Sequence, residues 1–128
     1  MLDWAEMRGM TKAGIDFGSH TCSHPILTRI PPGKLEHEVA DSKRAIEANL
    51  GLPCVFFAYP NGRPADCPER IGELLERHGY AAACANVHGF NDAATDRMML
   101  RRLPIGDYAP ALFALVLEFW LAFGRRPR

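Results

Sequence analysis

The sequence predicts an α/β protein in which parallel strands are covered on the outside by helices. Short apolar runs of β-forming residues alternate with longer segments whose apolar residues recur at helical spacing, and this alternation is typical of a parallel sheet. The chain has 128 residues, about half of the roughly 250 that a closed (β/α) barrel needs. We therefore expect a partial barrel, formed as one domain over residues 1–128, because no internal repeat or linker interrupts the pattern.

The first half of the chain predicts a helix, a strand, a loop and a second helix. The first helix is capped by Asp3 and ends just before Gly14. A short strand over residues 15–18 leads into a loop over residues 19–25. A helix over residues 35–50 follows a Pro-Pro-Gly turn and carries four apolar residues on one face: Leu35, Val39, Ile46 and Leu50. Since a helix that packs on a parallel sheet normally follows a strand, the opening helix suggests that the first strand is missing.

The second half begins with a strand over residues 54–59, a continuous run of apolar β-formers that ends at the turn signature Pro60-Asn61-Gly62. The remaining elements are a helix over residues 68–79, a strand over 80–85, a polar loop over 86–97, a strand over 100–105 and a helix over 111–123. Pro104 indicates that the last strand lies at an edge or ends there. The final helix is strongly apolar, and we expect it to pack as a core helix.

Composition and charge make several classes of function improbable. Fifteen basic and fifteen acidic residues cancel, so we expect no nucleic-acid partner and no anionic membrane surface. The longest apolar run, over residues 109–123, is too short to span a bilayer. Residues 1–6 show no signal-peptide pattern, which makes the cytoplasm the default expectation. The four cysteines form no CxxC pair, and we expect buried free thiols at Cys22, Cys54, Cys67 and Cys84.

Two histidines four residues apart are the main candidates for chemistry. His20 and His24 follow the predicted strand over residues 15–18, and parallel α/β proteins place their sites in such loops. Pro25 disfavours helical geometry at His24, so the pair differs from the helical HExxH motif of zinc proteases. A loop can direct both imidazoles onto one metal ion. From the spacing alone, ordinary loop histidines hydrogen-bonded to the backbone remain the simpler interpretation.

Several segments resemble the motifs of one enzyme family. Residues 14–28, with the sequence GIDFGSHTCSHPILT, closely resemble the second motif of the polysaccharide deacetylases, the NodB-homology enzymes of carbohydrate esterase family 4. The helix over 35–50 carries a similar Glu-x-x-Asp-Ser-Lys sequence, residues 57–63 look like the third motif, and residues 100–105 resemble a strand near the end of these domains. The resemblance implies a partial (β/α) barrel of the deacetylase type without its first strand.

The resemblance also implies metal-assisted hydrolysis of N-acetyl or O-acetyl groups on a polysaccharide or oligosaccharide, with zinc or another divalent ion as cofactor. By their positions in the second motif, His20 and His24 match the two histidine ligands. In the third motif, Asn61 matches the residue whose backbone N–H contacts the oxyanion. Tyr59 and Pro60 belong to the same turn and are expected to bind substrate.

Departures from the family pattern predict a weakened site. No segment matches the family's T-F-D-D-G motif, which supplies the general base and the third metal ligand, so we expect weak metal binding and impaired hydrolysis. Ala58 stands where many relatives carry an arginine that orients the base; Arg102 could replace it, unless Arg101 points inward instead. His88 is expected to be a surface residue rather than the family's catalytic acid.

Two functional classes therefore stay open, an impaired deacetylase and a non-catalytic remnant with a metal-binding or structural role. The observation that would distinguish them is whether the DNA upstream of Met1 encodes, in frame, a strand ending in Asp-Asp. A sheet that lacks its first strand also has a bare edge, which predicts self-association.

Overall fold

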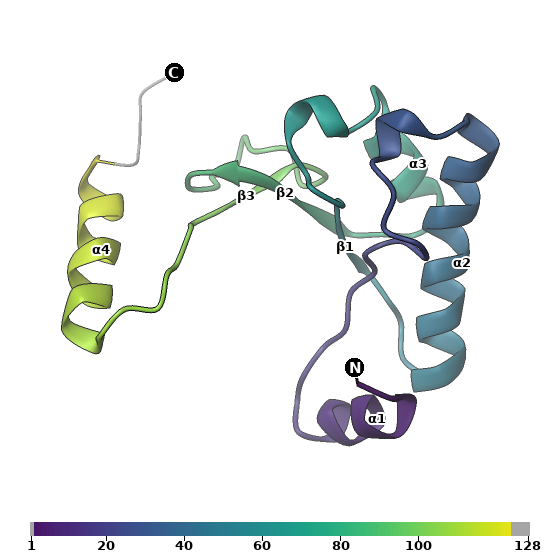
Figure 1. The fold of residues 1–128 in the computed structure, drawn as a ribbon, viewed down its shortest axis with the longest axis horizontal. Coiled ribbons are helices and arrows are strands. Elements are labelled where there is room, and N and C mark those ends of the chain that lie inside the picture. Colours follow the sequence, from purple (N-terminus) through teal and green to yellow (C-terminus); the bar gives the residue numbers. More distant parts are fainter. Residues whose placement is uncertain (1, 124–128) are drawn as a thin grey trace.

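The structure is a computed structural model that describes residues 2–123, and its centre is a three-stranded parallel sheet (Figure 1). The strands lie in the order β1-β2-β3. In chain order the elements are α1 (Trp4–Lys12), the 3-10 turn η1 (Leu27–Arg29), α2 (Pro32–Leu50), β1 (Phe56–Ala58), the 3-10 turn η2 (Pro64–Asp66), α3 (Ile71–Arg77), β2 (Ala82–His88), β3 (Leu100–Arg102) and α4 (Pro110–Phe123). The predicted α/β class is confirmed. No helix in residues 2–123 combines the length and the apolar character needed to cross a bilayer.

The core lies between the sheet and helices α2 and α3. Because side chains alternate along a strand, Phe57 of β1 and its register partner Ala83 of β2 both point toward the helices and are buried. The ring of Phe57 makes edge-to-face contacts with Tyr59 and Tyr80, at centroid distances of 5.3 and 5.4 Å. Val39 of α2 is fully buried in the same cluster, together with Ile71, Leu74 and Leu75 of α3. These are positions that the helical spacing predicted.

The prediction of a strand over residues 15–18 is wrong. Only the next residue, Ser19, pairs with β1, through an isolated parallel bridge to Phe57. The Ser19 N–H donates to the Phe56 carbonyl and the Ala58 N–H donates to the Ser19 carbonyl, each at 2.8 Å. Ile15 is 47% exposed, so little apolar burial stabilises a longer ladder at this edge.

The strand boundaries at the other edge also differ from the sequence pattern. β2 continues to His88, three residues into the segment expected to be a polar loop, because β3 pairs with it there. β3 ends at Arg102, two residues before Pro104, as expected for a residue without a backbone N–H. His88 is exposed, in agreement with its predicted surface position.

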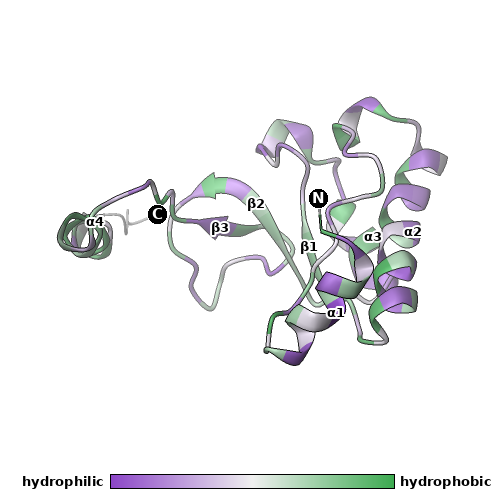
Figure 2. Cartoon of the chain, turned by 60° about the horizontal axis from the view of Figure 1, so that its bottom comes forward, coloured by the Kyte–Doolittle hydropathy of each residue, from purple (hydrophilic) through white to green (hydrophobic). Residues whose placement is uncertain are grey.

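The final helix is not a core helix. Figure 1 shows α4 beyond β3, well away from α2 and α3, and every α4 side chain over residues 110–122 is exposed or only half-buried. Figure 2 shows hydrophobic residues around its whole circumference, and the most exposed are Leu115, Phe119 and Leu121. Composition predicted the helix correctly, but no surface within residues 2–123 covers it.

The four cysteines are free, but only Cys54 is buried. Burial raises the pKa of the Cys54 thiol, and burial followed by the nearby Asp66 carboxylate raises that of Cys67 to about 11. Cys22 lies exposed in the loop between the two histidines. The expectation of buried thiols is therefore confirmed for Cys54 and wrong for Cys22, while Cys67 and Cys84 are only half-buried.

Candidate functional site

His20 and His24 lie side by side beyond the carboxyl end of β1. Their ring centroids are 4.7 Å apart and their planes meet at 72°. The Nδ1 atom of His20 lies 2.7 Å from the carbonyl oxygen of Ala58, the last residue of β1. Because a carbonyl can only accept, this hydrogen bond places a proton on Nδ1, and in the neutral imidazole it leaves a free lone pair on Nε2. A histidine that binds a metal through Nε2 needs this tautomer.

The backbone between the two histidines adopts an unusual conformation. Thr21 and His24 have positive φ angles of 68° and 57°, in a region that disfavours residues with a Cβ atom. The N–H of His24 donates to Oγ1 of Thr21 at 3.0 Å, and the N–H of Thr21 donates to Oγ of Ser19 at 3.4 Å. Such a conformation persists only where its surroundings fix it.

One face of α2 fixes this loop at two points. The Oγ atoms of Ser42 and Ser19 are 2.6 Å apart and both residues are buried. One turn earlier on the helix, the Glu38 carboxylate accepts the N–H groups of Cys22 and Ser23, at 2.8 and 2.9 Å, and the Ser23 hydroxyl at 2.5 Å. Burial acts to raise the pKa of Glu38, but the hydrogen bonds from Ser23 and Cys22 outweigh it and hold that pKa below its usual range.

Sequence reasoning missed Glu38 as a residue of this site. Glu38 and Ser42 are four residues apart and so share one face of α2. That spacing, inside a segment already similar to the family's sequence, was the signal that could have identified them.

The turn after β1 presents a backbone amide at the same strand end. Asn61 and Gly62 have positive φ angles of 58° and 70°. The Gly62 carbonyl accepts the N–H of Asn86 at 2.7 Å, and a Cβ atom at Gly62 would lie 2.9 Å from that nitrogen, so the position requires glycine. Asn61 is exposed, and its N–H donates to no group in residues 2–123.

Tyr59 and Pro60 lie beneath this turn, and both are buried. The Tyr59 hydroxyl donates to the Met98 carbonyl at 2.7 Å, and the Tyr59 N–H donates to the Cys84 carbonyl at 3.1 Å. The two side chains thus support the turn from the core side and show little surface to solvent.

Of the two arginines that the sequence left open, Arg102 is linked to the turn. The strand register pairs Arg102 with His88 and Leu100 with Cys84, which puts Arg102 on the sheet face opposite the helices. Its Nη2 atom donates at 3.2 Å to the Cys84 carbonyl, the same oxygen that accepts the Tyr59 N–H. The Arg101 side chain instead packs against Gly89, where a Cβ atom would lie 3.1 Å from Arg101 Cδ.

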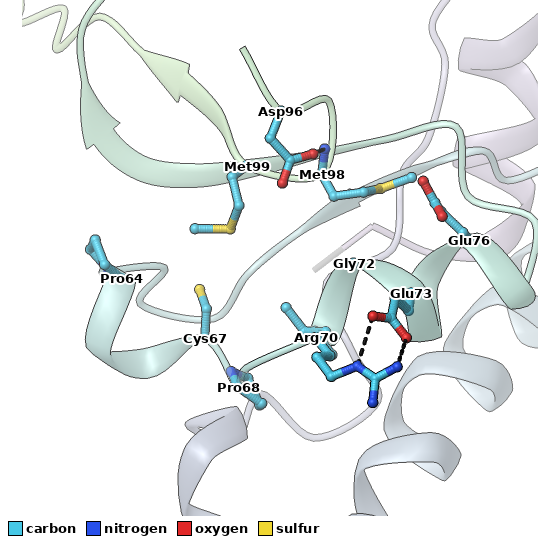
Figure 3. A pocket seen from close by; sticks show the side chains of 11 residues that line it. Pro64, Cys67, Pro68, Arg70, Gly72, Glu73, Glu76, Asp96, Met98 and Met99 are labelled. Atoms are coloured by element: carbon cyan, nitrogen blue, oxygen red, sulfur yellow. Dashed lines mark hydrogen bonds and ion pairs between the residues drawn. The ribbon is translucent and has the colours of Figure 1, made fainter. Parts of the chain in front are cut away.

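Two cavities lie beside α3, and none of the predicted site residues lines either of them. One, of about 380 Å³, opens between α3, η2 and the residues before β3, and its walls include Cys67, Met98 and Met99 (Figure 3). The other, of about 310 Å³, lies between α2 and α3. The candidate site therefore lies outside both of these cavities.

The histidine pair fits part of a zinc ligand set. Zinc in proteins usually takes four ligands, and imidazole nitrogen is among the commonest. The two rings are close enough to share an ion, and His20 presents a free Nε2. However, the described residues contain no group of three or more His, Cys, Asp or Glu side chains able to hold a metal. Both oxygens of the nearby Glu38 are occupied by loop hydrogen bonds.

Comparison with known proteins decides the family. Residues 3–83 match the family model of the polysaccharide deacetylases. The chain belongs to this family. A Bacillus subtilis (strain 168) protein, YxkH, whose name assigns it to the polysaccharide deacetylases, is 31% identical over 75 residues, which are 59% of this chain and 26% of that protein.

Solved deacetylase structures share the fold. The Streptococcus pyogenes deacetylase PplD, solved in complex with acetate, is 25% identical with a TM-score of 0.79, over 98% of this chain and 51% of that one. BC0361, a polysaccharide deacetylase from Bacillus cereus, is 24% identical with a TM-score of 0.76, over 91% of this chain and 36% of that one. The chain thus spans between about a quarter and about half of the length of these relatives.

Proposed function

We propose that this deacetylase chain contributes the histidine half of a metal site that removes acetyl groups from an acetylated polysaccharide or oligosaccharide. The proposal rests on the position of the two histidines and the Asn61 turn at one end of β1. Two imidazoles 4.7 Å apart lie at the same strand end as a turn whose Asn61 N–H has no partner within the described residues. Family membership supports the substrate class, and the S. pyogenes relative was solved with acetate.

His20 and His24 are the residues that would hold a divalent ion, and imidazole nitrogen favours zinc. When bound, zinc supplies Lewis acidity toward the acetyl carbonyl and toward water. The Ala58 carbonyl supports this role because it holds the proton on Nδ1 of His20 and leaves Nε2 available. Both histidines are exposed, which leaves room for a polymeric substrate.

The turn would act on the acetyl carbonyl oxygen. As negative charge develops on that oxygen, the Asn61 N–H would donate a hydrogen bond to it. This role uses the main chain, so an asparagine side chain is compatible with it. Tyr59 and Pro60 would serve substrate binding by supporting the turn from below, since both are buried. Arg102 is the candidate for orienting a general base, because its guanidinium is tied to the same strand end.

We further propose that hydrolysis is weak in the 128-residue chain as it stands. A proton acceptor for water and a third metal ligand are both required, and no carboxylate of the described residues joins the histidine pair. With two protein ligands, zinc affinity should be low. A strand carrying two aspartates would supply both functions.

An acetate-release assay on an N-acetylated chitin oligosaccharide tests this proposal. We expect no zinc-dependent turnover from the 128-residue chain, and turnover after an N-terminal Thr-Phe-Asp-Asp-Gly strand is added. His20→Ala should abolish that turnover. His37→Ala should preserve it, because His37 is an exposed α2 residue beside Asp41. Turnover that survives removal of both His20 and His24 would refute the histidine site.

A non-catalytic metal-binding or structural role is the second candidate. It is favoured by the lack of a three-ligand group within residues 2–123. Zinc binding without acetate release, even after the aspartate strand is added, would establish this alternative over the first.

We also propose that the chain self-associates through the sheet edge formed by residues 15–19, beside β1. Ser19 and His20 occupy the outward backbone groups of β1, but no strand of the described residues pairs with the far side of residues 15–19. The apolar side chains of Ile15 and Phe56 are 47% and 48% exposed. Unpaired strand edges readily accept another strand. Sedimentation velocity should show concentration-dependent dimers that Phe56→Lys abolishes and that Leu52→Lys, in the connection before β1, preserves. A monomer at all concentrations would exclude this interface.

A further inference from the structure

We propose that Glu38 is a positioning residue that fixes the His24 ring beside His20 by clamping the loop backbone between them. This inference rests on the function proposed above for the histidine pair. It adds Glu38, which belongs to the Glu-x-x-Asp-Ser-Lys segment of α2 and not to the histidine or turn motif, as a residue that determines whether the pair can act together.

The two histidines are held in different ways. The His20 ring has its own anchor, the Ala58 carbonyl at 2.7 Å from Nδ1. Within residues 2–123 the His24 ring makes no hydrogen bond or ion pair, and its ring contact is the edge contact with His20. Its backbone N–H donates to Oγ1 of Thr21, and its φ angle is 57°. The position of the His24 ring therefore follows from the loop backbone.

Glu38 holds that backbone directly. One carboxylate oxygen accepts two consecutive N–H groups, those of Cys22 and Ser23, and the other accepts the Ser23 hydroxyl. Two successive amides can converge on one oxygen only if the chain turns between them, and this is the turn that leads from His20 back to His24. Charge-assisted hydrogen bonds of this kind are stronger than neutral ones.

The clamp matters because the loop conformation is intrinsically unfavourable. Thr21 and His24 both have positive φ angles, which non-glycine residues leave when nothing holds them. Ser42 secures only the start of the loop, through Ser19. Without the Glu38 carboxylate, the stretch from Cys22 to His24 loses three of its four hydrogen bonds to α2 and keeps the weak one from the Cys22 thiol to the Glu38 carbonyl at 3.9 Å, so we expect the His24 ring to move away from His20.

Zinc affinity and two metal-free measurements on the 128-residue chain test this role. Zinc affinity is measured by competition with a chromophoric chelator. The metal-free readouts are the nuclear Overhauser effect between the His20 and His24 rings and the hydrogen-exchange protection of the Cys22 and Ser23 amides. Glu38→Ala should weaken zinc binding about 10–100-fold, as loss of an outer-shell partner typically does. It should also abolish the ring–ring signal and the amide protection.

Two further variants separate positioning from general effects. Glu38→Gln should stay within about threefold of the parent, because its amide oxygen can accept both N–H groups and its NH₂ can donate to the Ser23 hydroxyl oxygen. Glu36→Ala makes the same substitution two residues earlier on α2, where the carboxylate faces His78 at 3.3 Å. It should leave all three readouts unchanged.

The outcomes distinguish this inference from the function on which it rests. A folded Glu38→Ala chain that keeps the ring–ring signal and the amide protection overturns the clamp. If the parent chain binds no zinc, the proposed metal site fails, and the two metal-free readouts still decide the clamp. If Glu38→Ala does not fold, Ser23→Ala, which removes the hydroxyl bond to Glu38, decides it. Partial loss of Cys22 and Ser23 protection then supports the clamp, and full retention overturns it.

Discussion

Removal of the Ser42 hydroxyl tests how the histidine loop is tied to α2. The Ser42 and Ser19 oxygens are 2.6 Å apart, and the two residues are 6% and 1% exposed. In Ser42→Ala the buried Ser19 hydroxyl still accepts the Thr21 N–H at 3.4 Å but loses the acceptor for its own proton, and an unsatisfied buried polar group costs about 1–3 kcal/mol. For a chain of this size, roughly 4 °C of melting temperature corresponds to 1 kcal/mol. We therefore expect Tm to fall by about 4–12 °C.

The reverse substitution should cost less. In Ser19→Ala the Ser42 hydroxyl keeps two possible acceptors within α2, the carbonyls of Glu38 at 2.8 Å and Val39 at 3.1 Å. We expect a loss of about 1 kcal/mol or less. The double variant leaves neither hydroxyl orphaned, so its destabilisation should fall short of the sum of the single values by about 1 kcal/mol.

Urea unfolding followed by circular dichroism measures all three variants against the parent. Equal slopes of unfolding free energy against urea concentration would show that the variants expose similar surface on unfolding. If Ser42→Ala is neutral, or if the two single effects add within about 0.3 kcal/mol, the hydroxyl pair does not couple the loop to α2.

Three further substitutions test the turn, the half-buried thiol of Cys67 and the support beneath the turn. Gly62→Ala should lower the free energy of unfolding, measured in urea, by at least about 2 kcal/mol, because strain at positive φ combines with a Cβ contact of 2.9 Å to the Asn86 nitrogen. The control Gly51→Ala, at a φ of 69° and with no atom within 4 Å of the added Cβ, should lower it less. Burial raises the pKa of Cys67 from 9.0 to about 11. The stability supplied by its neutral thiol is therefore complete below pH 9 and is lost as pH rises toward 11. Cys67→Ala should lose less unfolding free energy than the parent between pH 9 and 11, and an identical loss would contradict the raised pKa of Cys67. Tyr59→Phe leaves the Met98 carbonyl without the hydroxyl at 2.7 Å and should lower unfolding free energy by about 1–2 kcal/mol without changing zinc affinity; a fall in zinc affinity would assign Tyr59 a direct part in the site.

Much of the secondary structure follows from short-range chemistry and was predictable. Asp3 accepts the Glu6 N–H while the Glu6 carboxylate accepts the Asp3 N–H, a capping box that begins α1 at Trp4. Gly51 ends α2 at a φ of 69°, as a C-terminal glycine should. The family, too, was predictable, because its second motif is a contiguous string of residues.

Features that depend on a partner surface were not predictable. Residues 15–18 have the composition of a strand, but only Ser19 pairs with β1, because pairing needs a neighbouring strand and burial as well as β propensity. The helix over residues 111–123 was correctly predicted, yet its packing was not, since an apolar segment forms a helix whether or not another surface covers it. The choice between Arg101 and Arg102 likewise required the register of β3 against β2.

The candidate site likewise combines features that the sequence predicted with contacts that it did not. The sequence by itself determined the residue types, two histidines four apart and a Pro-Asn-Gly turn, because these are local patterns. Only the tertiary structure brought the His20 ring onto the Ala58 carbonyl and the loop onto Glu38, contacts that join residues 38 and 15–16 positions apart. The physical reason is that a side-chain oxygen or a strand-end carbonyl can accept a hydrogen bond from any segment that the fold carries to it. Neighbouring residues in the chain do not encode which segment that will be.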